Sequence, residues 1–244
     1  MSVFVISDLH LSTAESTDKS MEVFGNRWQD YENKIKTNWT RLIDENDTVI
    51  IPGDISWATL TEEAKSDFAF ISSLPGKKII GKGNHDFWWA TAAKLNAFFE
   101  KNGFKNISLL YNNAHLAENF IITGTRGWFF DEENGKIPEN SDYDKLIGRE
   151  SARLKMSLDA GKKLQKENPD CEIIAFLHFP PIWNGIEVSQ FCDLLSEYGI
   201  KRCYFGHIHG TYSVPPEFTH KGVRYTLISA DYISFVPKLI PPLG

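Results

Sequence analysis

The chain has 244 residues, a formal net charge of −6 and three cysteines without a CxxC pair. A chain of this length can bury a core without disulfides, and this cysteine pattern argues against both a disulfide framework and a thiolate metal site within the motifs. The acidic balance argues against a non-specific nucleic-acid binder, and the absence of a signal-peptide pattern or an apolar run of ~20 residues predicts a cytoplasmic protein with no membrane partner.

Short apolar runs alternate with helix-like stretches along most of the chain. The runs expected to form strands are rich in Val, Ile and Phe and cover residues 3–7, 48–52, 78–81, 108–111, 120–123, 172–177, 202–205 and 225–229. The stretches expected to form helices cover residues 28–44, 61–73, 88–101, 142–167 and 188–198. This alternation predicts an α/β fold, and no linker or repeat divides residues 1–244 into more than one domain.

The middle of the chain departs from this alternation. Residues 107–126 contain strand-like runs joined by the turn at Asn112 and Asn113, with no helix between them, which predicts a mixed sheet or two sheets. Polar, poorly periodic segments predict long loops at residues 12–25, 130–141 and 215–222.

Five of the seven histidines lie in short motifs that follow the strand-like runs. In chain order the motifs are Asp8-Leu9-His10, Gly53-Asp54, Gly83-Asn84-His85-Asp86, His178 and Gly206-His207-Ile208-His209. Ligands of open α/β sheets bind at the carboxyl ends of strands, so we expect these motifs to converge on one edge. Their imidazole, carboxylate and amide donors suit a pair of divalent ions such as Mn, Fe, Zn or Co.

This order of motifs resembles that of the calcineurin-like metallophosphoesterase superfamily, and it extends from Asp8 to His209. The resemblance implies an α/β (mixed α+β) fold, a four-layer αββα sandwich of two mixed β-sheets flanked by helices. It also implies two metal ions that share one carboxylate. The implied ligands are Asp8, His10, Asp54 and His209 for one ion, and Asp54, Asn84, His178 and His207 for the other.

The resemblance implies a metal-dependent phosphoester hydrolase. Two ions about 3.5–4 Å apart would activate a bridging hydroxide for in-line attack on phosphorus. His85 would face the substrate as general acid, or as a cation beside the leaving oxygen, without binding metal. Both a phosphomonoesterase and a phosphodiesterase fit the sequence, with a phosphorylated small-molecule or nucleotide-like substrate, and no pattern indicates an oligomeric state.

Two alternatives compete with this interpretation. A nuclease is disfavoured by the acidic charge and by the lack of a recognisable DNA-binding appendage. A scaffold protein that keeps the fold without catalysis is disfavoured because the motif set is complete from Asp8 to His209.

The partner of His85 is not indicated by the motifs. Some family members carry an acidic residue or a histidine three positions after the bridging aspartate, where it orients the catalytic histidine, but here that position is Trp57. Asp86 is the nearest candidate in sequence, although neighbours at a strand end often point apart.

Three further features carry weaker signals. Arg126 stands between glycines at a strand end and is a candidate for a bidentate contact to substrate phosphate, with a salt bridge to a loop carboxylate as an equal alternative. His115 and His220 lie in no motif, and we expect both at the surface. We expect all three cysteines to be small buried hydrophobic side chains.

Overall fold

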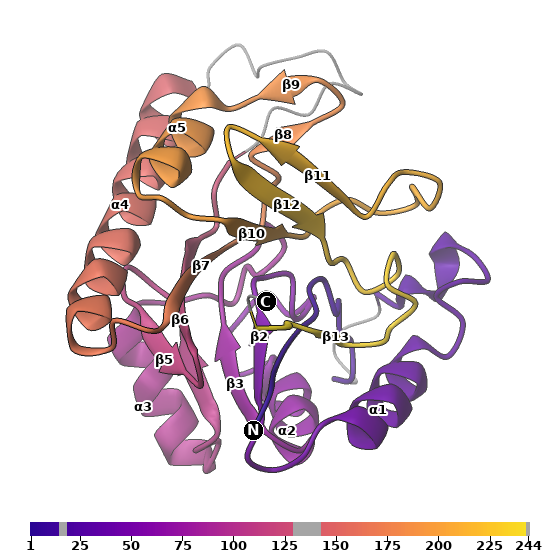
Figure 1. Cartoon of the computed structure of the whole chain (residues 1–244). Coiled ribbons are helices and arrows are strands. Elements are labelled where there is room, and N and C mark those ends of the chain that lie inside the picture. The colour runs from indigo at the N-terminus through magenta and orange to yellow at the C-terminus, as the bar shows by residue number, and fades with distance from the viewer. Residues whose placement is uncertain (15–18, 129–142, 243–244) are drawn as a thin grey trace.

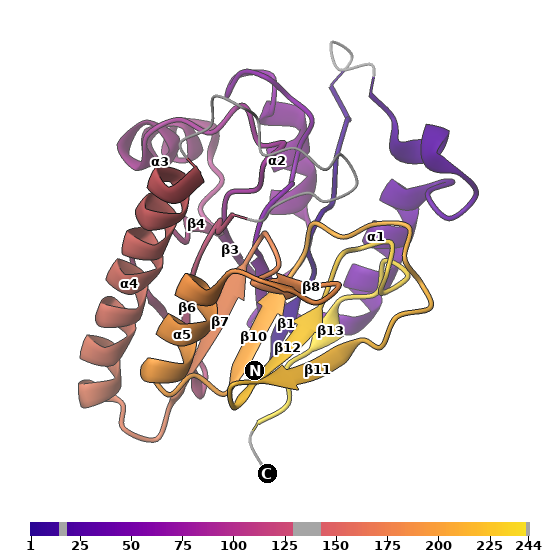
Figure 2. The ribbon, with the colours of Figure 1, turned by 90° about the horizontal axis from the view of Figure 1, so that it is seen from above.

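Two mixed β-sheets packed face to face form the centre of the structure, a computed structural model that describes residues 1–14, 19–128 and 143–242 (Figure 1). Helices α1, α2 and α3 cover the outer face of one sheet, and α4 and α5 cover the outer face of the other (Figure 2). This is the four-layer αββα sandwich expected from the sequence.

The first sheet has four parallel strands and one antiparallel edge strand. Their order is β13 (Lys238–Leu239), β1 (Val3–Val5), β2 (Thr48–Ile51), β3 (Lys77–Ile80) and β4 (Ile107–Leu109). Only β13 runs antiparallel to its neighbour. The helices associated with this sheet are α1 (Tyr31–Leu42), α2 (Lys65–Ser73) and α3 (Ala92–Asn102), and a short 3₁₀ helix covers Met21–Phe24.

The second sheet has four parallel central strands between two antiparallel edges. Its order is β11 (Glu217–His220), β12 (Val223–Leu227), β10 (Arg202–Phe205), β7 (Glu172–Leu177), β6 (Phe120–Thr125) and β5 (His115–Ala117). The helices α4 (Tyr143–Glu167) and α5 (Ser189–Glu197) pack on it, and β8 (Ile182–Trp183) pairs with β9 (Ile186–Glu187) in a separate hairpin.

Alternating side chains along the strands build the layers. In β1, Val3 and Val5 face the second sheet, whereas Phe4 faces the helices α1 to α3. In β7, Ile174 and Phe176 join the core between the sheets, whereas Ile173 packs toward α4 and α5. Because both faces of the central strands are buried, these strands appear in the sequence as continuous apolar runs.

Of the two alternatives expected from residues 107–126, a mixed sheet or two sheets, the structure has two sheets, with Asn112 and Asn113 between β4 of the first sheet and β5 of the second. The loop expected at residues 215–222 is wrong, since it contains β11, whose Phe218 pairs with Tyr225 of β12. The loop expected at residues 130–141 lies outside the described residues.

Helices α1, α2 and α3 begin three or four residues later than the periodicity predicts, α3 at Ala92 after its N-cap Thr91. The first begins at Tyr31 because Asp30 takes a left-handed conformation with φ of 54°. The second begins at Lys65, after turns in which the Glu63 carboxylate accepts hydrogen bonds from the backbone of Thr59 and Leu60. Among the described residues, no helix combines the length and the apolar character needed to cross a bilayer.

Candidate metal centre

The motif residues lie at the carboxyl ends of strands from both sheets, as the sequence predicts. Backbone hydrogen bonds continue the pairing of β1 and β2 past the strand ends, from Asp8 N to Gly53 O (3.0 Å) and from His10 N to Asp54 O (2.9 Å). Ser7 joins the two sheets at this edge, because its N–H donates to Ile228 O and its carbonyl accepts from Ala230 N. Ligand loops from both sheets therefore meet in one place.

Four of the motif residues have a left-handed backbone, with φ of 60° at Asp8, 46° at His10, 50° at Asp54 and 70° at His207. This conformation costs a non-glycine residue roughly 1–2 kcal/mol, and such strain persists only where the surrounding structure enforces it. Here the backbone hydrogen bonds between the loops enforce it. The strain lies at the residues whose side chains converge.

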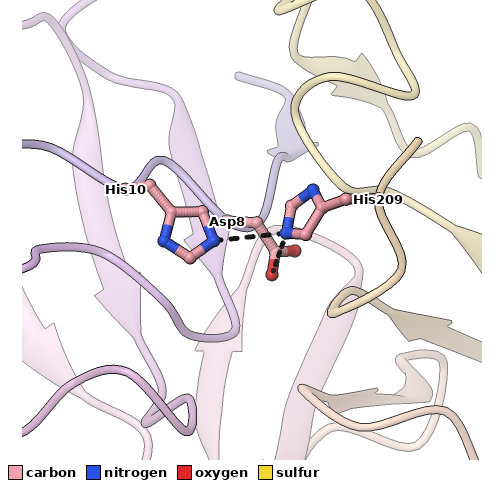
Figure 3. A group of neighbouring side chains, drawn as sticks. All are labelled: Asp8, His10 and His209. Atoms are coloured by element: carbon pink, nitrogen blue, oxygen red, sulfur yellow. Dashed lines mark hydrogen bonds and ion pairs between the residues drawn. The ribbon is translucent and has the colours of Figure 1, made fainter. Parts of the chain in front are cut away.

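Asp8, His10 and His209 form the first group of potential ligands (Figure 3). Asp8 Oδ1 lies 3.5 Å from His209 Nε2, and His10 Nε2 lies 3.2 Å from the same nitrogen. Two imidazole nitrogens this close cannot both carry a proton. Lone pairs directed at a shared cation satisfy this geometry.

The second group consists of Asp54, His178 and His207, with Asn84 beside them. Asn84 Oδ1 lies 2.6 Å from His178 Nε2 and 3.0 Å from His207 Nδ1. Asp54 Oδ2 lies 3.5 Å from His178 Nε2. These donors are again imidazole, carboxylate and amide oxygen, the set that suits divalent transition metals.

The Asp54 carboxylate lies between the two groups. Its Oδ2 atom is 3.6 Å from His10 Nε2 in the first group and 3.5 Å from His178 Nε2 in the second. The other oxygen, Oδ1, accepts a hydrogen bond from the backbone N–H of His85 over 2.8 Å. This is the position of a carboxylate that two ions can share.

Burial sets the charges of the centre. Burial raises the pKa of the Asp54 carboxyl, and the neighbouring Asp86 and Asp8 raise it further. Burial also lowers the pKa of His10 and His178, which keeps both rings neutral and their lone pairs available. Burial therefore disfavours the ionised form of Asp54, and the neutral rings of His10 and His178 beside it do not compensate. A bound cation would stabilise the ionised carboxylate, so this arrangement fits a metal site.

The sequence of the chain matches the model of the calcineurin-like phosphoesterase family over residues 1–211. The chain belongs to this family. No curated protein sequence matches the chain.

Solved structures share the fold of this calcineurin-like phosphoesterase at low sequence identity. The phosphopantetheinyl hydrolase of Mycobacterium tuberculosis superposes with a TM-score of 0.55 at 15% identity, over 100% of this chain and 96% of that one. The protein TT1561 of Thermus thermophilus superposes with a TM-score of 0.51 at 12% identity, over 94% of this chain and 89% of that one.

Two glycines of the family motifs permit close approach to the centre. A Cβ atom on Gly83 would overlap the carboxylate of Asp54, and a Cβ atom on Gly206 would overlap that of Asp8. The glycines therefore allow the loops after β3 and β10 to pack directly against the two carboxylates.

Asp231 is a site residue that the sequence analysis missed. Its buried carboxylate accepts hydrogen bonds from His209 Nδ1 (2.8 Å), Gly210 N (3.1 Å) and Tyr212 Oη (3.0 Å). Asp231 lies in no motif, and it is beyond the residues 1–211 that match the family model. The available signal was its position shortly after an apolar run, which it shares with Asp8 and Asp54.

Asp86 is buried, and its hydrogen bonds are to backbone N–H groups rather than to the ring of His85. Its carboxylate accepts hydrogen bonds from the backbone N–H groups of Asp54 (2.9 Å), Ile55 (2.9 Å) and Gly83 (2.7 Å), and from the indole of Trp88 (3.0 Å). Burial raises the pKa of Asp86 to about 6, although the backbone donors oppose this shift. Asp86 thus connects the loop that carries Asp54 with the loop that carries Asn84.

Trp57 lies between two histidines of the centre. Its ring stacks on His10 with centroids 4.9 Å apart and contacts His85 at 4.4 Å. Burial lowers the pKa of the His85 ring. The position that carries a polar orienting residue in some relatives therefore provides an aromatic wall here.

Arg126 lies at the end of β6, next to His178 in the neighbouring strand. Its carbonyl accepts hydrogen bonds from His178 N (3.2 Å) and Phe179 N (2.9 Å). Its guanidinium is 3.4 Å from the buried carboxylate of Glu150, in α4 and not in a loop, and Arg153 binds the same oxygen at 2.6 Å. Arg126 therefore forms a salt bridge, to a helix carboxylate, and its place beside His178 is also compatible with a contact to substrate phosphate.

Proposed function

We propose that the chain hydrolyses phosphoesters with two divalent transition-metal ions, Mn, Fe or Zn, held by these two groups. The position of Asp54 Oδ2, 3.6 Å from His10 Nε2 and 3.5 Å from His178 Nε2, carries this proposal. One ion is held by Asp8, His10, Asp54 and His209, and the other by Asp54, Asn84, His178 and His207. Membership of the phosphoesterase family supports the reaction class.

The bound ions would supply Lewis acidity toward the phosphoryl oxygens and would lower the pKa of the water that attacks phosphorus. His85 donates a proton to the leaving oxygen. Its backbone is fixed by the hydrogen bond to Asp54 Oδ1, and Trp57 restricts its ring. Burial lowers the pKa of His85, so its protonated ring gives up the proton more readily.

Two further residues support the reaction. We assign Asp86 to positioning, because its carboxylate holds the backbone of both the Asp54 and the Asn84 loops. Arg126 contacts a substrate phosphoryl oxygen from its place beside His178. Lys82 and Arg153 line the same small cavity as Arg126, so the region adds positive charge beside the centre.

Because the chain has a net charge of −6, we propose a phosphorylated small molecule rather than nucleic acid as its substrate.

The test is hydrolysis by metal-stripped and metal-reloaded protein. Protein treated with EDTA should be inactive toward chromogenic phosphomonoesters and phosphodiesters, and Mn²⁺ or Zn²⁺ should restore turnover. A panel of mono-, di- and cyclic phosphoesters then separates a monoesterase from a diesterase. Absence of turnover with every metal and substrate, from protein that binds metal, would favour a scaffold and contradict the proposal.

A further inference from the structure

A third group of potential metal ligands lies outside the two groups of the dinuclear centre. Glu187 in β9, Cys192 in α5 and His220 in β11 each offer one ligand atom, and these atoms lie within 4.8 Å of one another. We propose that these three side chains bind one further divalent ion of the zinc class. Carboxylate, thiolate and imidazole are the three donor types that Zn²⁺ accepts in proteins.

The cluster contains polar atoms that other side chains leave without a suitable partner. His220 Nε2 is 3.1 Å from Glu187 Oε2, yet it is buried and has no properly aligned hydrogen bond among the described residues. Cys192 is fully buried, and its hydrogen-bond acceptor is Pro181 O at 3.6 Å, a weak interaction. An ion between these atoms would satisfy the imidazole and the sulfur together.

Tyr225 supplies an independent observation. Its side chain is fully buried, and its hydroxyl lies beside the Cys192 sulfur without a well-formed hydrogen bond in the described part of the chain. An unpaired buried hydroxyl is costly, and a thiol is a weak acceptor. A metal-bound thiolate is a charged acceptor, so ion binding would give the Tyr225 hydroxyl a partner.

Binding at this cluster balances charge and protons. Burial raises the pKa of the Cys192 thiol to about 11, so binding displaces one proton from sulfur to solvent as the sulfur–metal bond forms. The thiolate and the Glu187 carboxylate then neutralise the two positive charges of the ion. Lys221 remains paired with Glu187 Oε1 (2.5 Å) and Asp193 Oδ1 (2.6 Å), which leaves Glu187 Oε2 directed toward His220.

The three ligands come from separate pieces of the fold. Glu187 belongs to the β8–β9 hairpin, Cys192 to a helix, and His220 to the edge strand of the second sheet. The side chains of Glu187 and His220 are 24% and 32% exposed, although His220 Nε2 itself is buried, so the site lies just below the surface and its fourth ligand would be a water molecule that enters with the ion. The ion would tie the edge strand β11 to the hairpin and to α5.

Cobalt absorption tests this site separately from the dinuclear centre. The full chain is stripped with a chelator and titrated with Co²⁺, and the sulfur-to-cobalt charge-transfer band in the near ultraviolet is recorded. The proposed dinuclear ligands include no cysteine, so the band reports a thiolate site whether or not the chain hydrolyses phosphoesters. The dinuclear centre also binds Co²⁺, so we expect the saturated band to have the intensity of one thiolate-bound Co²⁺ per chain, and we expect Zn²⁺ to remove it by competition.

Variants assign the band to these residues. Cys192→Ser should abolish it, whereas the matched control Cys171→Ser, a half-buried thiol that lies against Glu118, should retain it. His220→Gln and Glu187→Gln, at partly exposed positions, keep the thiol and should weaken Co²⁺ binding tenfold or more. No band in the wild-type chain, a band in Cys192→Ser, or unchanged affinity in His220→Gln would overturn the proposal.

Discussion

His209 donates a hydrogen bond from Nδ1 to Oδ1 of Asp231 over 2.8 Å, and this bond leaves Nε2 to face Asp8 and His10. Despite burial, the hydrogen bonds to Asp231 and Asp8 raise the pKa of His209 to about 10, so a metal ion at Nε2 would displace the proton there while Nδ1 keeps its proton toward Asp231. Asp231 follows β12, beyond the residues that match the family model. The C-terminal part of the second sheet thus contributes to orienting a ligand of the first metal group.

Replacement of Asp231 by Ala should weaken metal binding by about 10–100-fold, because the His209 ring loses the partner that fixes its orientation. Titration calorimetry with Mn²⁺ measures the change, and Asp231→Asn, which retains an acceptor, should restore part of the affinity. Tyr212→Phe is the matched control, since it removes another donor to Asp231 and keeps the bond from His209. Wild-type affinity in Asp231→Ala would show that the ring needs no such support.

Replacement of His85 by Ala should lower kcat by roughly 10²–10⁴-fold, the usual contribution of a general acid. The metal content should stay unchanged, because His85 belongs to neither ligand group. Steady-state kinetics and metal analysis of the same preparation check both statements. Loss of metal from this variant would contradict the role assigned to His85.

Replacement of Arg126 by Ala should raise KM or lower kcat by about tenfold, because the substrate phosphate loses a cationic partner. Arg149→Ala is a suitable control: Arg149 is also near Glu150, at 3.8 Å, but its side chain is 53% exposed and does not line the cavity beside Arg126. Unchanged kinetics in Arg126→Ala would leave only the ion pair with Glu150 as the role of this residue.

Replacement of Asp86 by Ala should lower the free energy of unfolding by about 3 kcal/mol, since several buried N–H groups lose a charged acceptor. Urea unfolding of metal-free protein measures this change without the contribution of bound ions. A variant of wild-type stability that has lost turnover would instead indicate that Asp86 acts directly in catalysis.

The parts of the fold that the sequence predicts well are those buried on both sides. The strands at residues 172–177 and 202–205 have the predicted bounds, because continuous apolar runs between two layers leave little choice of register. The missed strands β5, β8, β9, β11 and β13 are short and lie at sheet edges or in a separate hairpin. One face of such strands is partly exposed, so apolar content does not mark them.

The sequence likewise predicts some residues of the candidate site and not others. The motifs indicate which residues follow a strand, and the structure brings Asp8, Asp54 and His178 together as predicted. The supporting contacts of Asp231 and Trp57 depend on tertiary packing, which no local pattern encodes. The single-domain organisation of residues 1–244 stays a prediction, favoured by the apolar core that both sheets share.

The most direct test of the shared-carboxylate centre is electron paramagnetic resonance of the Mn²⁺-loaded chain. Two ions that share the Asp54 carboxylate are close enough for their spins to couple, so the wild-type chain should give the spectrum of an exchange-coupled pair. Asp54→Ala should lose that spectrum. Only the signal of isolated Mn²⁺ in the wild-type chain, or a coupled pair retained in Asp54→Ala, would contradict the dinuclear centre bridged by Asp54.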